Sequence, residues 1–189
     1  MVCVTMRDRY ELVDVINFMG YQRAVVVGAR SGLFSHYLLK HSALEKLISL
    51  EACSKTVVVS RSKIKIKTHI EQATMQYMLE QFGDRSEMRF SDEQDEVAES
   101  FDDYQFDMVY MSEPVTGKGL RSQLEAWYPK LRRSGLLCGY GYVTDRWKDT
   151  SLEKANAVRE SVDEFARERG YEVAATGEPM GTWYFIKKP

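Results

Sequence analysis

Short, largely apolar runs alternate with amphipathic segments along most of the chain, and this order limits the possible folds more than any single motif does. The runs predicted as strands are 23–28, 46–51, 87–90, 106–111 and 135–140. The first holds Ala24 and three consecutive valines, the composition of a strand buried on both faces of a parallel sheet. Helical periodicity over 8–19, 33–40, 60–82, 92–101, 120–131 and 152–169 supplies the long crossovers that parallel strands require.

The end of the chain breaks this alternation. Two further strands are predicted over 171–176 and 182–187, and the five residues 177–181 join them. So short a connection forces an antiparallel pair. The sequence therefore predicts an α/β fold: a Rossmann-like, doubly wound, mostly parallel seven-stranded sheet with a C-terminal antiparallel hairpin, in a three-layer α/β/α sandwich. We expect a single domain over 1–189, in which 1–20 is an N-terminal helical segment.

Composition narrows the class of protein. The 189 residues are 44% hydrophobic, enough for a sizeable core, and the net charge of −2 argues against a dedicated nucleic-acid binder. The basic run over 55–67 is interpreted as a solvated face, in which 64–67 forms either a short strand or an irregular helix start. The three cysteines form no CxxC pair, and no apolar run approaches the ~18 residues of a membrane span. We expect a reduced cytoplasmic protein with no membrane or nucleic-acid partner, and the oligomeric state stays open.

Ligands of open α/β sheets bind at the carboxyl ends of the strands, so the loops there are the candidate site. The turn 28–32 follows the first strand, and its glycines let the backbone approach a ligand. Glu51 ends the second strand, where an acid can accept both hydroxyls of a ribose. Ser91 and Asp92 follow the third, where an adenine would lie. The ordinary alternatives are a turn that only packs a helix and an exposed acid at the end of a strand.

The turn excludes two common nucleotide motifs. It lacks the Gly-Lys-Ser/Thr of a P-loop and the GxGxxG of a dinucleotide fingerprint. The C-terminal hairpin then favours S-adenosylmethionine over NAD as the cofactor. The cofactor-binding residues predicted from these loops are Gly28, Ala29, Arg30, Gly32, Glu51, Ser91, Asp92 and Ser112.

The chain resembles the class I S-adenosylmethionine-dependent methyltransferases, and among them a family of small domains related to the macrocin O-methyltransferase type. The resemblance lies in 25–39, 44–51, 82–85, 106–110, 124–131, 134–139, 158–170 and 183–185. It covers about 8–188 in the expected order. It implies the same sheet, S-adenosylmethionine as cofactor, and Glu51 as the acid that binds the ribose.

Two loops depart from that family. Where the family's fourth strand ends in Ile-Asp-Gly-Asp-His, this chain has Met-Ser-Glu-Pro-Val at 111–115, and Gly-His-Asp-Tyr becomes Gly-Tyr-Gly-Tyr at 139–142. Ser112, Val115 and Gly141 cannot replace carboxylates as ligands of a magnesium-type metal. We therefore expect no metal at this site. Arg30 stands where many methyltransferases have a second glycine.

Methyl transfer requires an aligned acceptor and, for a hydroxyl acceptor, removal of a proton. Glu113 and Asp145 are the candidate catalytic carboxylates, and a plain solvated loop acid is the ordinary alternative for each. Tyr110, Tyr140, Tyr142 and Trp147 are candidate walls of an acceptor pocket, with packing as the alternative. Cys138 is predicted to be an inert core residue.

Two functions remain open from the sequence. The first is a metal-independent S-adenosylmethionine-dependent methyltransferase that acts on a small-molecule acceptor. The alternative is a catalytically degenerate methyltransferase-like protein that binds the cofactor or a nucleotide, or acts as an interaction module. The replaced acids and histidines support the second, and the turn with Glu51 supports the first.

Overall fold

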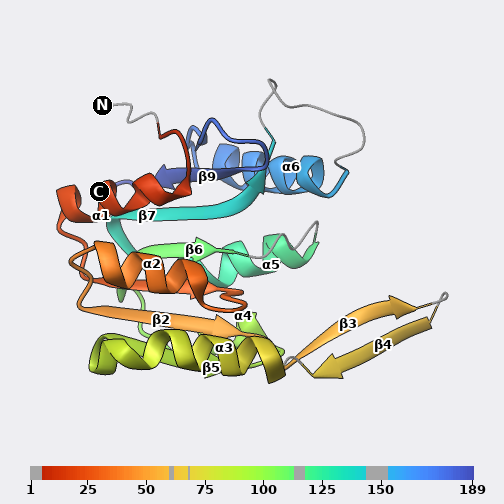
Figure 1. Ribbon diagram of the computed structural model, residues 1–189. Helices are drawn as coiled ribbons and strands as arrows, with labels where there is room; N and C mark the ends of the chain where they lie inside the picture. The colour runs from red at the N-terminus through yellow and green to blue at the C-terminus, as the bar shows by residue number, and fades with distance from the viewer. Residues whose placement is uncertain (1–5, 60–61, 68, 113–117, 144–152) are drawn as a thin grey trace.

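The computed structural model describes residues 6–59, 62–67, 69–112, 118–143 and 153–189, with the backbone alone at 54–59, 62–67, 118 and 153–155. Its main sheet has seven strands (Figure 1). In spatial order they are β5 (Ser86–Phe90), β2 (Lys46–Glu51), β1 (Arg23–Val27), β6 (Phe106–Met111), β7 (Leu131–Tyr142), β9 (Gly181–Ile186) and β8 (Ala174–Ala175).

Strand directions confirm the predicted fold class. The five strands from β5 to β7 pair in parallel, whereas β9 runs antiparallel to both β7 and β8. The reversal follows from the short connection between β8 and β9, which leaves no room for a crossover. The sheet is therefore mostly parallel and ends in an antiparallel hairpin.

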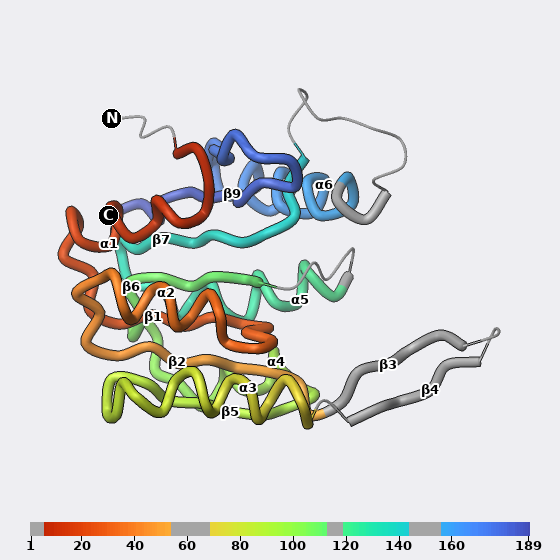
Figure 2. The backbone as a smooth tube through the Cα atoms, viewed as in Figure 1, coloured from red at the N-terminus to blue at the C-terminus, as the bar shows by residue number. Residues whose placement is uncertain are grey.

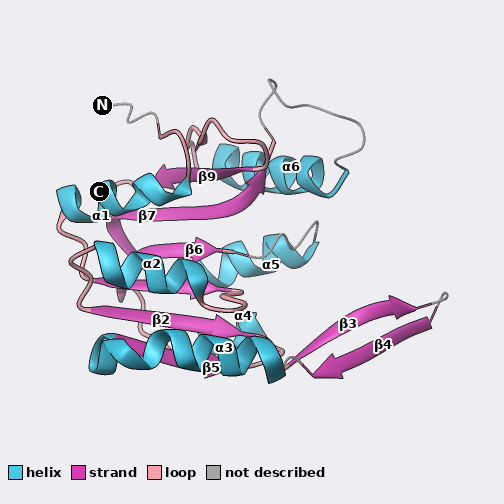
Figure 3. Cartoon of the chain, in the orientation of Figure 1, coloured by secondary structure: helices cyan, strands magenta, loops and turns pink. Residues whose placement is uncertain are grey.

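Helices cover both faces of the sheet and complete the three layers (Figure 3). One face packs against α1 (Leu12–Met19), α2 (Leu33–His41) and α3 (His69–Leu79), and the other against α4 (Gln94–Ala98), α5 (Lys118–Trp127) and α6 (Glu153–Glu168). Alternate residues of β1 serve the two cores: Ala24 and Val26 join the first, Val25 and Val27 the second. Because both faces of the strand are buried, its composition is apolar throughout.

The N-terminal helix ends before Gly20 as predicted, but its first turn is a 3₁₀ turn and the α-helix begins only at Leu12. Asp8 accepts a hydrogen bond from the backbone N–H of Tyr10 at 2.8 Å and caps a short 3₁₀ turn, η1 (Arg9–Glu11), which leads into α1. Gly20 ends α1 in a left-handed conformation with φ of 63°. Both are ordinary helix-end chemistry: an aspartate at the start and a glycine beyond the end.

The prediction of a helix over 60–82 is wrong in its first part. The backbone forms an antiparallel hairpin of β3 (Ser54–Val59) and β4 (Ser62–Lys67), a two-stranded sheet of its own, and α3 begins only at His69. The 3₁₀ turn η2 (Glu80–Arg85) then leads into β5. Three consecutive valines in β3 and a period of two in β4 favour strand over helix.

The boundary between α5 and β7 also differs from the prediction. Leu131, placed in the helix by the sequence pattern, instead pairs with Phe106 as the first residue of β7. The helix ends at Trp127, two residues before Pro129, because proline restricts the residue before it to extended conformations. The apolar side chain of Leu131 is buried in either arrangement, so its periodicity did not distinguish them.

Asp107 joins the start of β1 to β6. Its Oδ2 accepts the backbone N–H groups of Gln22 and Arg23, each at 2.7 Å, and its Oδ1 pairs with the Arg132 guanidinium. The residue is 8% exposed, so its carboxylate is largely shielded from solvent. The Asp107 carboxylate therefore fixes the amino edge of the central strands.

Asp107→Ala is expected to lower the free energy of unfolding by about 2–4 kcal/mol, because it leaves two backbone donors and one guanidinium unpaired. Asp107→Asn keeps a side-chain oxygen for the two N–H groups and should cost less than half as much. Urea unfolding followed by circular dichroism measures both. An alanine variant within ~0.5 kcal/mol of wild type, the usual range of a surface substitution, would contradict this role.

Within the described residues, no helix has both the length and the apolar character needed to cross a membrane.

Candidate functional site

The carboxyl ends of the central strands lie side by side and bring the predicted loops together. Val27 of β1 is level with Leu50 of β2 on one side and with Met111 of β6 on the other. Two backbone hydrogen bonds continue the edge: the Ser91 N–H donates to the Glu51 carbonyl at 2.9 Å, and the Ser112 N–H donates to the Val27 carbonyl at 2.8 Å. The residues predicted from four separate loops therefore share one edge of the sheet.

The turn after β1 is tight and is anchored on the neighbouring strand. The N–H groups of Gly28 and Ala29 both donate to the Leu50 carbonyl at 2.9 Å, and the Gly32 N–H donates back to the Ala29 carbonyl at 2.9 Å. Gly28 and Gly32 both have φ of 76°, in the left-handed region that glycine favours. The turn thus delivers the chain into α2 directly over the end of β1.

Arg30 adopts the same left-handed conformation, with φ of 54°. This geometry explains why glycine suits the position and why arginine is strained there. Its side chain extends to α3, where Nη2 lies 3.8 Å from Glu71 Oε1. The backbone of Arg30, rather than its side chain, belongs to the turn.

Glu51 is fully buried, which excludes the alternative of an exposed acid at the end of a strand. One carboxylate oxygen, Oε2, accepts the backbone N–H of Arg30. The turn folds back onto the end of β2, so this carboxylate lies beneath it and fixes its shape. Glu51 therefore connects the second strand to the turn that the sequence predicts to bind a cofactor.

The third and fourth loops are more open. Ser91 is half-buried, and its hydroxyl accepts the Glu93 N–H at 3.1 Å; Asp92 beside it is exposed. Ser112 is half-buried at the end of β6. These side chains are therefore more exposed at the edge than Glu51 is.

The two predicted catalytic carboxylates, Glu113 and Asp145, lie outside the described residues, as does Trp147. Of the candidate aromatic walls, Tyr110 is wholly buried and Tyr142 donates its hydroxyl to Asp163 of α6 at 2.6 Å. Burial raises the pKa of both phenols above the usual range. These two tyrosines are packing residues, as the alternative interpretation held, and Tyr140 is half-buried.

Cys138 is fully buried in β7, and desolvation raises the pKa of its thiol well above the usual value. This agrees with the prediction of an inert core residue, because the thiolate is the reactive form. Elsewhere in the described part of the chain, no three histidine, cysteine, aspartate or glutamate side chains gather closely enough to hold a metal ion.

Arg9 is a residue that the sequence analysis did not single out. Its guanidinium carbon lies 5.3 Å from the centroid of Tyr10, 5.4 Å from that of Phe34 and 5.6 Å from that of Tyr140. Phe34 follows the glycine turn, and Tyr140 lies near the carboxyl end of β7. No local pattern marks Arg9, because the approach of the N-terminal segment to β7 is a tertiary contact.

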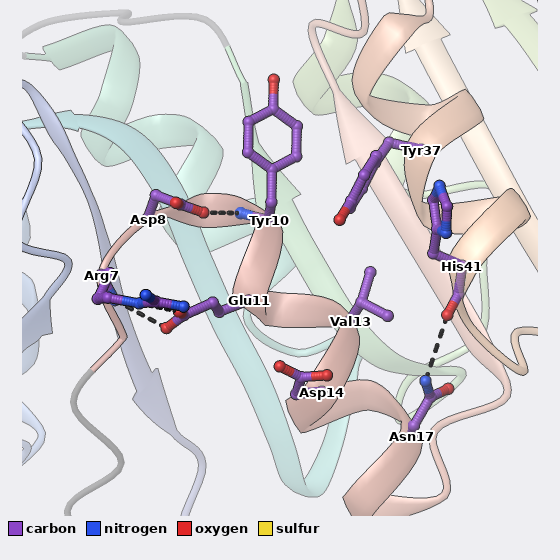
Figure 4. Close-up of a pocket in the computed structure, with 9 residues that line it drawn as sticks. All are labelled: Arg7, Asp8, Tyr10, Glu11, Val13, Asp14, Asn17, Tyr37 and His41. Carbon is purple, nitrogen blue, oxygen red and sulfur yellow. Dashed lines mark hydrogen bonds and ion pairs between the residues drawn. The ribbon is translucent and has the colours of Figure 1, made fainter.

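A hollow of about 440 Å³ lies outside this edge, in the groove between the N-terminal helix and α2 (Figure 4). Its walls include Asp8, Tyr10 and Glu11 on one side and Tyr37 and His41 on the other. An Asn17–His41 hydrogen bond of 3.3 Å closes its far end. None of the residues predicted to bind the cofactor lines it, so it is separate from the strand-end site.

In the sequence comparisons, no protein-family model and no curated protein matches the chain. Comparison of structures is more informative. A Staphylococcus aureus protein with the provisional name caffeoyl-CoA O-methyltransferase superposes with a TM-score of 0.70 at 15% identity, over 98% of this chain and 86% of that one.

Two further similar structures contain S-adenosylhomocysteine. The Bacillus cereus O-methyltransferase superposes with a TM-score of 0.66 at 13% identity, over 95% of this chain and 80% of that one. A Podospora anserina methyltransferase gives 0.67 at 10% identity, over 94% and 76%. Identities this low show the fold alone. The chain thus has the Rossmann-like fold that these methyltransferases share.

Proposed function

We propose that the chain is an S-adenosylmethionine-dependent methyltransferase that acts on a small-molecule acceptor. The observation that carries the proposal is the bond from the Arg30 N–H to the buried Glu51 carboxylate, which sets a fixed turn and an acid at the carboxyl edge. The similar structures with bound S-adenosylhomocysteine support the same ligand. Fold alone does not determine activity, so the site residues and their test decide it.

The donor set fits the cofactor. In the proposal Glu51 holds the ribose hydroxyls, Ser91 and Asp92 lie on the adenine side, and the turn from Gly28 to Gly32 faces the methionyl part. When bound, the cofactor supplies an electrophilic methyl group. The chain's own contribution is to align the acceptor with that group, which accounts for much of the rate in such transfers. In the proposal Glu113 and Asp145 are the bases that take a hydroxyl proton from the acceptor.

Calorimetric titration with S-adenosylmethionine and S-adenosylhomocysteine is the direct test. Saturable binding of both would support the cofactor assignment and justify a screen of small hydroxylated acceptors for release of S-adenosylhomocysteine. Absence of heat with either ligand at millimolar concentration would overturn the proposal.

We also propose that transfer needs no divalent metal, because Ser112, Val115 and Gly141 stand where the resembling family carries carboxylates or a histidine. Treatment with a chelator such as EDTA is expected to leave the initial rate within about twofold of the untreated enzyme, since no Lewis acid would be removed. The rate of S-adenosylhomocysteine release measures this. A tenfold loss that Mg²⁺ restores would contradict metal independence.

The same replacements favour one alternative, a methyltransferase-like protein that has lost catalysis. Such a protein binds the cofactor or a nucleotide, or acts as an interaction module. The titration and the acceptor screen separate the two. Cofactor binding without transfer to any acceptor would support the alternative, and transfer to one acceptor would exclude it.

A further inference from the structure

The N-terminal segment carries an arginine to the carboxyl edge of the sheet. Figure 2 shows this segment beside the turn between β8 and β9. The Gly177 N–H donates to the Arg7 carbonyl at 3.1 Å, and the Arg9 N–H donates to Glu178 Oε1 at 3.2 Å. These backbone bonds fix where the Arg9 side chain starts, so its approach to the edge is set by the fold.

The Arg9 guanidinium is half-buried among aromatic rings rather than carboxylates. Tyr10, Phe34 and Tyr140 lie within 5.3–5.6 Å. Its side-chain hydrogen bonds go to two tyrosine hydroxyls, a long one of 3.5 Å to Tyr10 and one to the buried Tyr110. No ion pair joins Arg9 to any carboxylate of the described residues, whereas the neighbouring Arg7 pairs with Glu11 at 2.5 Å. A guanidinium has five N–H donors, so the two tyrosine hydroxyls leave donors of Arg9 for a charged ligand.

The register of the sheet places this group relative to the proposed cofactor. Gly139 of β7 is level with Met111 of β6 and therefore with Val27 of β1, and Tyr140 is the next residue. Glu51 belongs to β2, on the opposite side of β1. If Glu51 holds the ribose, the Arg9 guanidinium lies at the part of the carboxyl edge where the methionyl part and the acceptor would bind.

We propose that Arg9 binds a carboxylate of a ligand at the carboxyl edge of the sheet, an inference that rests on the proposed function. A planar guanidinium matches a carboxylate in shape and charge, and flanking rings reduce its contact with water and so strengthen the pairing. Two ligands could supply such a carboxylate: the methionyl moiety of the cofactor, or an acceptor that carries one. Both have the same chemistry, and the experiment distinguishes them.

The experiment compares matched ligands on purified wild type, Arg9→Met and Arg7→Met by calorimetry. S-Adenosylhomocysteine carries the methionyl-type carboxylate, and 5′-methylthioadenosine lacks it. For the acceptor, 4-hydroxybenzoate and uncharged 4-hydroxybenzamide are titrated in the presence of S-adenosylhomocysteine. Arg9→Met is expected to weaken one carboxylate ligand at least ~10-fold and its uncharged partner less than ~2-fold, since charge-assisted hydrogen bonds are the strong ones. Arg7→Met removes the same charge from an exposed site and should change neither pair.

Each result has a defined meaning. A loss confined to S-adenosylhomocysteine identifies the methionyl carboxylate, and a loss confined to 4-hydroxybenzoate identifies the acceptor. Equal losses within a pair, or no loss in either pair, would overturn the role of Arg9 while leaving the proposed function standing. Failure of wild type to bind either adenosine ligand would instead overturn the proposed function, and this inference with it.

Discussion

Glu51→Ala is expected to weaken binding of S-adenosylhomocysteine by at least about a hundredfold, because hydrogen bonds to a charged group are worth about 1.5–3 kcal/mol each and a ribose offers two hydroxyls. The substitution also removes the acceptor of the Arg30 N–H, which loosens the turn. Calorimetric titration measures the change in dissociation constant. Both effects lower the affinity, so Glu51→Ala should weaken binding more than a substitution that removes only one of them.

Glu51→Gln separates the two effects. The amide oxygen still accepts the Arg30 N–H, but the negative charge is gone, so binding should fall by only about tenfold. Glu45→Ala is the control, since Glu45 is an exposed acid just before the other end of β2. One result would show that Glu51 only supports the turn. In it, Glu51→Gln binds with wild-type affinity, whereas Glu51→Ala binds more weakly and unfolds at a lower temperature.

The fold was predictable because its signals are local. The valines of β1 indicate a strand buried on both faces, and the five residues before β9 indicate a change of strand direction. Neither signal depends on distant parts of the chain. The hairpin of β3 and β4 was mispredicted because a segment of alternating isoleucine and lysine carries a helix and a strand signal at once. Period alone does not separate them over so few residues.

The site was predictable only in part, for a physical reason. Glycine conformations and strand ends are properties of the local sequence, so the turn and Glu51 were found. That Glu51 is buried depends on how the turn folds over β2, and the position of Arg9 depends on contact between the two ends of the chain. Contacts between distant segments produce no periodic pattern in the sequence. The burial of Glu51 and the position of Arg9 could therefore not be predicted from the spacing of residues.

Gly32, in the turn after β1, is expected to tolerate substitution poorly. Its φ of +76° is strained for any residue with a Cβ, and an added Cβ would lie 2.7 Å from Met75 Cγ and 3.2 Å from Met75 Cα. Gly20 offers a matched control: its φ is +63°, but nothing lies within 4 Å of an added Cβ. The two sites therefore share the backbone strain and differ in the steric overlap.

Gly20→Ala is expected to lower the free energy of unfolding by about 1 kcal/mol, the cost of the left-handed conformation alone. Gly32→Ala should cost about 3 kcal/mol, because overlap in a packed core adds about 1–3 kcal/mol. Urea unfolding measures both. Equal costs would show that α3 moves away freely. A Gly32→Ala cost that is larger in wild type than in a Met75→Ala background, each measured against its own parent, would show that α3 holds the turn in place. In that case Gly32→Ala should also weaken S-adenosylhomocysteine binding, since the turn proposed to face the cofactor would be displaced.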